Sequence, residues 1–178
     1  MADHFPCELG LTDGSRVLLR RLSEHDGAAL FEFFQRLPAG LRRLAWDDID
    51  NRDVVEGWAR GVDYEATLPL VALDGAKIIA DATLHYRERG PLRLAGRIRW
   101  FIDPDYRGRG LAAAFAGRLI TVARENGLRY LSCMLATDFE EPDVKALESR
   151  GFTATHFPGY GTDPDGAPAD LTYLVCKL

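Results

Sequence analysis

The sequence predicts an α/β fold in which a mixed, twisted sheet of about six or seven strands is flanked by helices. Apolar runs of strand length occur on both sides of a central helical segment. A hairpin lies in the middle of the chain, and a glycine-rich loop joins one strand to a helix. The 178 residues are enough for one domain over residues 1–178, and we expect residues 1–10 to be a flexible N-terminus.

The expected elements follow the order β-α-α-β-β-β-α-β-α-β-β. They are a strand at 15–22, a helix that stops before Pro38, a helix at 51–61, two strands within 68–87, a strand at 96–103, a helix from Leu111 to 126–127, a strand at 129–136, a short helix at 142–150, and strands at 152–157 and 171–178.

Local signals support these boundaries. Ser23 and Asp26 resemble a capping box ahead of the first helix. The dipeptide at 74–75 is Asp-Gly, which between two apolar runs is a strong hairpin signal. Gly127 follows the last turn of the central helix, as is typical of a helix C-terminus.

Composition restricts the function classes. Hydrophobic residues make up 47% of the chain and the net charge is −5, which fits a globular protein and argues against a general nucleic-acid binder. No apolar run reaches the ~20 residues that span a bilayer, and the N-terminus does not resemble a secretory signal. Three scattered cysteines predict reduced thiols in the cytoplasm, and no Cys/His spacing predicts a metal site.

The segment "DPDYRGRGLA" at residues 103–112 predicts an anion site. A helix N-terminus presents unpaired N–H groups and a positive dipole end, and glycines allow a phosphate to approach the backbone. The stretch "GRGLAA" also satisfies the weak dinucleotide pattern G-x-G-x-x-A, but a meander precedes it and no acidic residue ends the next strand. A tight turn with two solvated arginines is the remaining alternative.

The stretch "RWFIDPDYRGRGLAAAFAGRLITVARENGL" resembles the acetyl-CoA site of the GNAT superfamily of N-acetyltransferases. Arg107, Gly110 and Ala112 fill the family's loop pattern Q/R-x-x-G-x-G/A, and "ESRGF" at 148–152 matches the start of its sixth strand. The N-terminal strand and helix resemble those of bacterial members. The resemblance implies the GNAT fold, in which strands 4 and 5 splay apart around the pantetheine arm. The implied cofactor-binding residues are Phe101, Ile102, Asp103, Arg107, Gly108, Arg109, Gly110, Leu111 and Ala112.

The usual catalytic groups are missing from their usual places. Relatives often carry a Glu where this chain has Arg97, and a Tyr where it has Leu147. The substitutes that we consider for general base or acid are His85 in the third strand, Asp138 and Glu140 after the fifth strand, and Tyr160 in the loop after the sixth. The arginines of "RERGPLRLAGRIR" are either a solvated face or a surface that attracts an anionic substrate.

The resemblance implies an N-acetyltransferase that moves an acetyl group from acetyl-CoA to a primary amine by direct attack in a ternary complex. The amine is a small molecule or a protein lysine. The alternative is a catalytically inactive acyl-CoA-binding or sensing protein of the same fold. We expect a monomer or homodimer with no metal, no nucleic-acid partner and no membrane partner.

Overall fold

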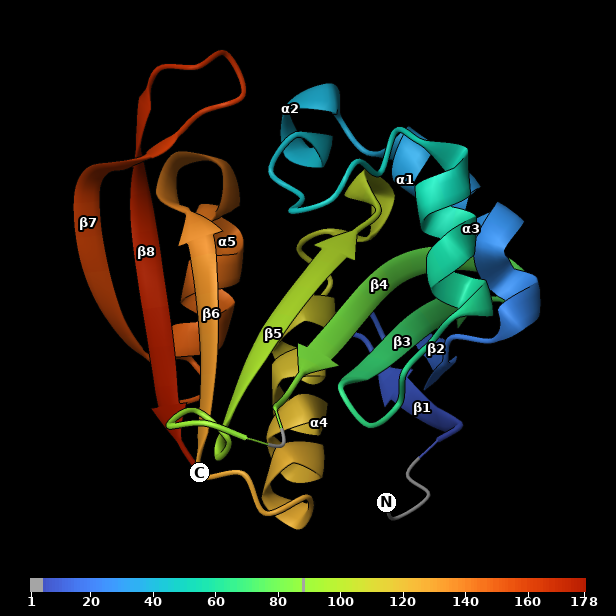
Figure 1. Cartoon of the computed structure of the whole chain (residues 1–178). Helices are drawn as coiled ribbons and strands as arrows, with labels where there is room; N and C mark the ends of the chain where they lie inside the picture. The colour runs from blue at the N-terminus through green and yellow to red at the C-terminus, as the bar shows by residue number, and fades with distance from the viewer. Residues whose placement is uncertain (1–4, 88) are drawn as a thin grey trace. The chain divides into compact units, whose positions relative to one another are not determined.

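The computed structural model describes residues 5–87 and 89–178. Its strands form one sheet in the order β1-β2-β3-β4-β5-β6-β8-β7, flanked by helices (Figure 1). The elements are β1 Cys7–Gly10, β2 Arg16–Arg21, η1 Glu24–Asp26, α1 Gly27–Arg36, α2 Ala39–Arg42, α3 Arg52–Arg60, β3 Thr67–Asp74, β4 Lys77–His85, β5 Ala95–Ile102, η2 Pro104–Tyr106, α4 Leu111–Glu125, β6 Tyr130–Ala136, α5 Thr137–Glu148, β7 Thr153–Thr162 and β8 Pro168–Lys177.

The predicted fold class is confirmed, but the predicted strand count was too low. The sheet has eight strands because Cys7–Gly10 pairs antiparallel with β2. This pairing also orders part of the segment that we expected to be flexible, while residues 1–4 of that segment lie outside the described residues. The short helix α2 was not predicted either, because Pro38 and Gly40 indicate a helix stop.

The chain divides into two compact units, which we describe separately. One unit contains the described residues of 5–83 and 100–111. The other contains the described residues of 84–99 and 112–178. The boundaries fall within β4 and β5, so each of these strands contributes to both units.

In the first unit, α1 and α3 pack on strands β3 and β4 (Figure 1). Phe34 of α1 is 1% exposed and lies edge-on to Trp58 and Phe101, with ring centroids 6.0 Å and 5.8 Å apart. Val71 and Ile78 complete the same cluster from the strands. The 3.6-residue spacing of the apolar residues in α1 therefore produces one buried helix face.

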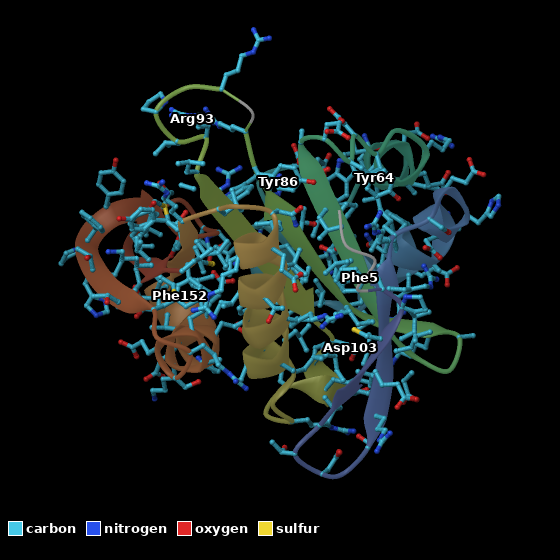
Figure 2. The ribbon with its side chains drawn as sticks, turned by 90° about the horizontal axis from the view of Figure 1, so that it is seen from below. Phe5, Tyr64, Tyr86, Arg93, Asp103 and Phe152 are labelled. Atoms are coloured by element: carbon cyan, nitrogen blue, oxygen red, sulfur yellow. The ribbon has the colours of Figure 1, made fainter. Side chains whose placement is uncertain are left out.

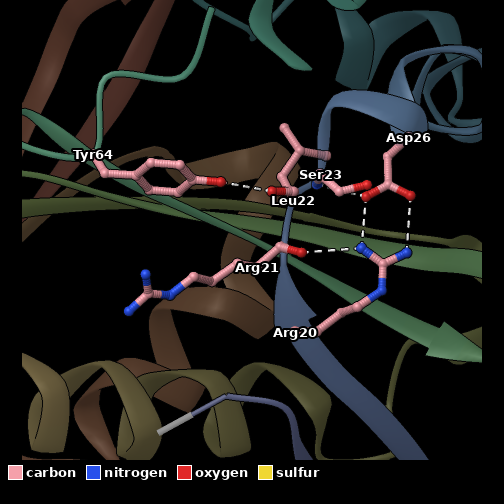
Figure 3. A network of polar contacts seen from close by, with 6 residues as sticks. All are labelled: Arg20, Arg21, Leu22, Ser23, Asp26 and Tyr64. Carbon is pink, nitrogen blue, oxygen red and sulfur yellow. Dashed lines mark hydrogen bonds and ion pairs between the residues drawn. The ribbon is translucent and has the colours of Figure 1, made fainter. Parts of the chain in front are cut away.

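A network of polar contacts stabilises the segment that joins β2 to α1 (Figure 3). Asp26 accepts hydrogen bonds from both terminal nitrogens of Arg20, at 2.5 Å and 2.8 Å, and from the backbone N–H of Ser23 at 2.7 Å. Tyr64 donates to the carbonyl of Leu22 at 2.9 Å. Burial would raise the pKa of Asp26, but the bonds from Arg20 and Ser23 outweigh it and hold that pKa below its ordinary value.

Replacing Asp26 with asparagine should lower the free energy of unfolding by about 1–3 kcal/mol at neutral pH, because a buried charged hydrogen-bond network loses its acceptor charge. The folded-state pKa lies below the ordinary value of 3.8, so the contribution of Asp26 is present above that pH and lost as the pH falls through the folded pKa. Urea unfolding of both proteins across pH checks this. The difference in the free energy of unfolding between the two proteins should become smaller in acid. A difference that stays constant with pH would argue against the assigned role of Asp26.

In the second unit, β6, β8 and β7 form an antiparallel sheet. Leu131, Cys133 and Leu135 of β6 are buried, and so are Thr172 and Leu174 of β8. Helix α5 covers this buried face (Figure 1). The intervening residues of the strands therefore point to the other face, as the two-residue period of a strand requires.

Strands β5 and β6 are parallel neighbours only where both begin. The register pairs Ala95 with Tyr130, Gly96 with Leu131 and Arg97 with Ser132. The ladder of the described strands ends there, although β6 continues to Ala136. Pairing over only three positions agrees with the splayed fourth and fifth strands that the family resemblance implied.

None of the helices in the described part of the chain is both long enough and apolar enough to span a membrane.

Candidate functional site

The loop between η2 and α4 has a backbone conformation that depends on two glycines. Gly108 has φ +72° and Gly110 has φ +81°, a left-handed region that other residues rarely adopt. A Cβ added at Gly108 would meet no atom within 4 Å, so the space beside this backbone is open. Arg107 is exposed beside it. The loop thus combines accessible backbone, positive charge and the start of a 15-residue helix, which together suit a phosphate group.

The turn between β1 and β2 packs against this loop. Thr12 donates its backbone N–H to the carbonyl of Arg109 at 2.9 Å. A Cβ added at Gly110 would lie 2.8 Å from Cγ2 of Thr12, closer than real Cβ contacts. The absence of a side chain at Gly110 is therefore required both by its φ and by the approach of Thr12.

Arg109 is held by two further contacts. Its guanidinium lies 3.5 Å from a carboxylate oxygen of Asp13 and 4.8 Å from the centre of the Tyr106 ring. Tyr106 in turn donates to Asp74 at 2.5 Å, and this hydrogen bond raises the pKa of Tyr106. The charge of Arg109 is therefore preorganised at the loop by residues of three other segments.

Asp103 anchors the start of the loop from inside the protein. The carboxylate is 2% exposed and lies 3.0 Å from Nε of Arg36 and 3.1 Å from Nζ of Lys77. Its other oxygen accepts the N–H of Asp105, which caps η2. Burial would raise the pKa of Asp103, but the bonds from Arg36 and Lys77 lower it below its ordinary value. This side chain is committed to internal contacts, and the backbone N–H and C=O of Asp103 are bonded to Ile79 and Tyr106 as well.

A buried ion pair lies where β5 and β6 diverge. Arg99 of β5 donates to Glu140 at 2.5 Å, and the second oxygen of Glu140 accepts the N–H of Ala136 at 2.9 Å. Arg99 is 7% exposed and Glu140 is 3% exposed. Burial raises the pKa of Glu140, and Arg99 and the Ala136 amide offset only part of that rise. The pair links the two strands beyond their last backbone pairing.

Comparison with known proteins decides which family has this arrangement. The sequence model of one protein family, the acetyltransferase (GNAT) domain, matches residues 16–153, which is more than half of the chain. The chain belongs to the GNAT acetyltransferase family. The resemblance that the sequence indicated is thereby confirmed.

Several relatives of this GNAT chain are known. The acetyltransferase PA5475 of Pseudomonas aeruginosa is 29% identical over 136 residues, which cover 68% of this chain and 67% of that protein. The GNAT domain of S. lividans PAT has a TM-score of 0.79 at 19% identity and covers 100% of this chain and 99% of its own. The protein yncA of Salmonella typhimurium, solved with its cofactor acetyl-CoA, has a TM-score of 0.75 at 22% identity, with 91% and 94% covered. At such identities the structural likeness shows the fold.

The predicted cofactor residues of the GNAT chain fall into two groups. The loop residues Arg107 and Gly108 are exposed, and Arg109, Gly110 and Ala112 are half-buried. Phe101, Ile102 and Leu111 are buried in the protein, with 6%, 5% and 1% of their surface exposed. The side chains of the second group are therefore not accessible to a ligand.

The predicted catalytic residues occupy four places. Asp138 is exposed in the first turn of α5, and Glu140 lies in the same turn but is buried. His85 is half-buried at the end of β4. Tyr160 of β7 is 73% exposed and packs against Phe157, with ring centroids 5.7 Å apart. The structure thus brings Asp138 and Glu140 into one helix turn and leaves His85 and Tyr160 on other elements.

Sequence reasoning missed two features. Thr12 and Asp13 lie in "LTDGS", where the Asp-Gly pair indicates a turn but nothing indicates contact with a loop about 96 residues later. Thr172 is fully buried, and its hydroxyl bonds to Thr137 at 2.8 Å and to Nδ1 of His156 at 2.9 Å. No local pattern brings these three residues together: the β7–β8 register places His156 opposite Thr172, and the packing of α5 on β8 brings Thr137 to it.

Within residues 5–87 and 89–178, no group of three or more His, Cys, Asp and Glu side chains is placed to hold a metal ion.

Proposed function

We propose that this GNAT chain transfers the acetyl group of acetyl-CoA to a primary amine by direct attack in a ternary complex. The observation that carries the proposal is the glycine loop ahead of α4, with open space at Gly108 and a preorganised Arg109. This loop fits a pyrophosphate. The family match and the acetyl-CoA complex of yncA support the same cosubstrate.

Acetyl-CoA supplies the activated acetyl thioester, and the protein positions it. The amides of residues 108–112 and the side chains of Arg107 and Arg109 would hold the pyrophosphate. The backbone of Phe101 and Ile102 would hold the pantetheine arm by strand-like hydrogen bonds, whereas the backbone N–H and C=O of Asp103 already bond to Ile79 and Tyr106. Both roles use groups that the fold already fixes, which reduces the entropy cost of binding.

Direct transfer is favoured over an acetyl-cysteine intermediate by the state of the thiols. Cys133 is 1% exposed, and burial raises its pKa to about 12. Burial also raises the pKa of Cys176. A thiolate is the reactive form of cysteine, so both residues are poor nucleophiles. All three cysteines, including Cys7, are free thiols, which also supports our proposal of a cytoplasmic location.

Amine acetylation requires that the amine loses a proton and that the departing sulfur gains one. Asp138 is our first candidate for the base because it is exposed directly after β6. Glu140 has both oxygens engaged, which favours a positioning role for it. His85 remains a second candidate base, and Tyr160 a candidate acid or substrate contact.

Asp138→Asn should lower turnover at about pH 7 far more than at about pH 9–10, where the neutral fraction of an alkylamine is at least about 100-fold larger than at pH 7. Acetyl-CoA affinity should hardly change, because Asn keeps the size of Asp. Steady-state rates of wild type and Asp138→Asn across pH check this. Equal rates at every pH would remove Asp138 as the base and make His85→Gln the next variant.

The overall proposal is tested by release of free thiol from acetyl-CoA in the presence of a broad panel of amines. We expect amine-dependent release with a small subset of the panel. Binding of acetyl-CoA without release for any amine would instead support an acyl-CoA-binding or sensing protein, and absence of binding would remove both functions.

Substituting Asp13 with asparagine should strengthen coenzyme A binding by about two- to fourfold at low salt, because a negative charge beside the anion loop is removed. The turn should persist, since Asn can still accept the Ser15 bonds that Asp13 accepts at 2.9 Å and 2.5 Å. Asp53→Asn, on α3, makes the same change of net charge elsewhere and serves as control. Calorimetry at two salt concentrations checks this, and weaker binding in Asp13→Asn would show that Asp13 matters mainly by holding Arg109.

A further inference from the structure

One end of the second unit collects cations, and we call this surface the basic end. It lies where β4 ends and β5 begins, next to the start of β6 and the end of β8 (Figure 1). The loop from β4 to β5, the residue before β6 and the last residue of β8 contribute its side chains. The exposed cations that define it are Arg87, Arg89, Arg93, Arg129 and Lys177.

Backbone contacts hold the segments of the basic end together. Leu94, at the end of the loop, accepts the N–H of Arg129 at 2.8 Å and that of Tyr130 at 3.2 Å. Leu178 donates its N–H to the carbonyl of Arg129 at 2.9 Å. Tyr130 is the register partner of Lys177. Side chains from three separate segments of the chain are therefore brought to one surface.

The loop from β4 to β5 carries its arginines on an ordered turn. Arg93 donates its backbone N–H to the carbonyl of Gly90 at 3.2 Å, and Nη1 of its side chain lies 3.5 Å from the same carbonyl. Ala95 donates its N–H to the carbonyl of Leu92 at 3.0 Å. The loop that carries Arg93 projects beyond the ends of the strands (Figure 2). A partner can therefore reach this loop without displacing other elements of the unit.

The cations of the basic end lack acidic partners, unlike many other cations of this protein. Among the described residues, none of the five forms an ion pair with a carboxylate. By contrast, Arg16 pairs with Glu8 at 2.8 Å and Arg52 pairs with Glu56 at 3.0 Å, although both arginines are exposed as well. In the described residues of 84–99, 122–133 and 174–178, the acidic side chain is Glu125. The basic end is therefore a local excess of positive charge in a chain whose net charge is −5.

Two large apolar side chains are exposed among these cations. Leu92 is 59% exposed and lies on the loop between Arg89 and Arg93. Tyr130 is 41% exposed and directly follows Arg129. Arginine and tyrosine are enriched in protein interfaces, where apolar contacts lie among complementary charges. This mixture suits an acidic partner that also carries apolar side chains.

We propose that the basic end binds an acidic segment of a partner protein, whose carboxylates pair with the arginines and whose apolar side chains contact Leu92 and Tyr130. The inference does not depend on the proposed acetyl transfer. Size favours a protein segment over RNA or an anionic membrane. A polyanion that extends beyond the basic end meets the rest of a net acidic chain and is repelled, whereas a short acidic segment meets only the cations.

The test measures the fluorescence anisotropy of a labelled peptide of glutamates that has a leucine at every third position. Wild type should bind this peptide at low salt and bind it more weakly as salt rises, because exposed charges are screened. Arg89→Gln/Arg93→Gln should bind about five- to tenfold more weakly, the effect of losing two exposed charge pairs. Leu92→Ser should weaken binding by about three- to tenfold and leave its salt dependence unchanged.

Arg16→Gln/Arg60→Gln is the matched control, because it removes two exposed arginine charges from the first unit. It changes the net charge as much as Arg89→Gln/Arg93→Gln does and should keep the wild-type affinity for the peptide. The same peptide with glutamine in place of every glutamate should not bind to wild type. Thiol release from acetyl-CoA with small amines should be the same in Arg89→Gln/Arg93→Gln as in wild type.

Absence of peptide binding, equal binding of the glutamate and glutamine peptides, or undiminished binding by Arg89→Gln/Arg93→Gln would overturn the inference. Tighter binding of single-stranded RNA or of phosphatidylserine vesicles than of the peptide, at the same salt, would overturn the assignment to a protein partner. Each of these results leaves the proposed acetyl transfer intact, because thiol release is measured separately.

Discussion

Gly110→Val is expected to abolish coenzyme A binding, with a loss of at least about 100-fold in affinity. A β-branched residue at φ +81° is strained, at about 1–2 kcal/mol or more. Its Cβ would also lie 2.8 Å from Thr12, so either the loop or the β1–β2 turn must move. Movement of the loop misplaces the amides that we propose for the pyrophosphate. Calorimetry with coenzyme A measures the loss.

Gly166→Val is the matched control for this variant. Gly166 has φ +91° in the β7–β8 turn, and a Cβ there would meet nothing within 4 Å. It carries a similar backbone penalty without a contact at the loop, so it should lower stability and leave coenzyme A binding unchanged. Full binding by Gly110→Val would show that the loop does not hold the ligand as proposed.

Removing the cation of the buried pair is expected to have the largest effect on stability. Arg99→Met leaves Glu140 buried without its charged partner, which should cost about 3–5 kcal/mol in the free energy of unfolding. Arg99→Met/Glu140→Gln should recover much of that loss, because Gln is neutral and still accepts the Ala136 N–H. Urea unfolding of the wild type, both single variants and the double variant measures the coupling.

The pH dependence of the same variant has a definite sign. The folded-state pKa of Glu140 is already above its ordinary value of 4.5, and loss of Arg99 raises it further. A group with a raised pKa favours the folded state fully below its ordinary pKa and loses that contribution as the pH rises through the folded pKa. The loss in Arg99→Met should therefore grow as the pH rises from the ordinary pKa of 4.5 toward neutral pH. A loss that shrinks over this range would falsify this account of the pair.

The sequence was informative about the fold wherever a local pattern had a single structural solution. The Asp74-Gly75 hairpin and the apolar spacing of α4 both lie where they were predicted. The early start of α5 was missed because Pro142 marks a helix start, whereas the helix begins at Thr137 with non-helical backbone at Glu140. Strand β1 was missed because four residues carry too little alternation, and its pairing with β2 supplies the stability.

The candidate site was predictable only in its backbone part. Gly108 and Gly110 made the loop predictable, because glycine readily adopts the positive φ that such a loop requires. The partner of Glu140 was not predictable, because Arg99 lies 41 positions away and only the fold joins them. The sequence therefore suggested a free carboxylate at Glu140, while the structure shows one that is fully engaged.

The central claim is that the acetyl group passes directly from acetyl-CoA to an amine. The most direct measurement uses acetyl-CoA labelled in its acetyl group under single-turnover conditions, with protein and amine separated and counted at each time point. The account predicts that label appears in the amine in equal amount to the thiol released, with none on the protein. Label that accumulates on the protein before it reaches the amine, or thiol release without labelled amine, would contradict it.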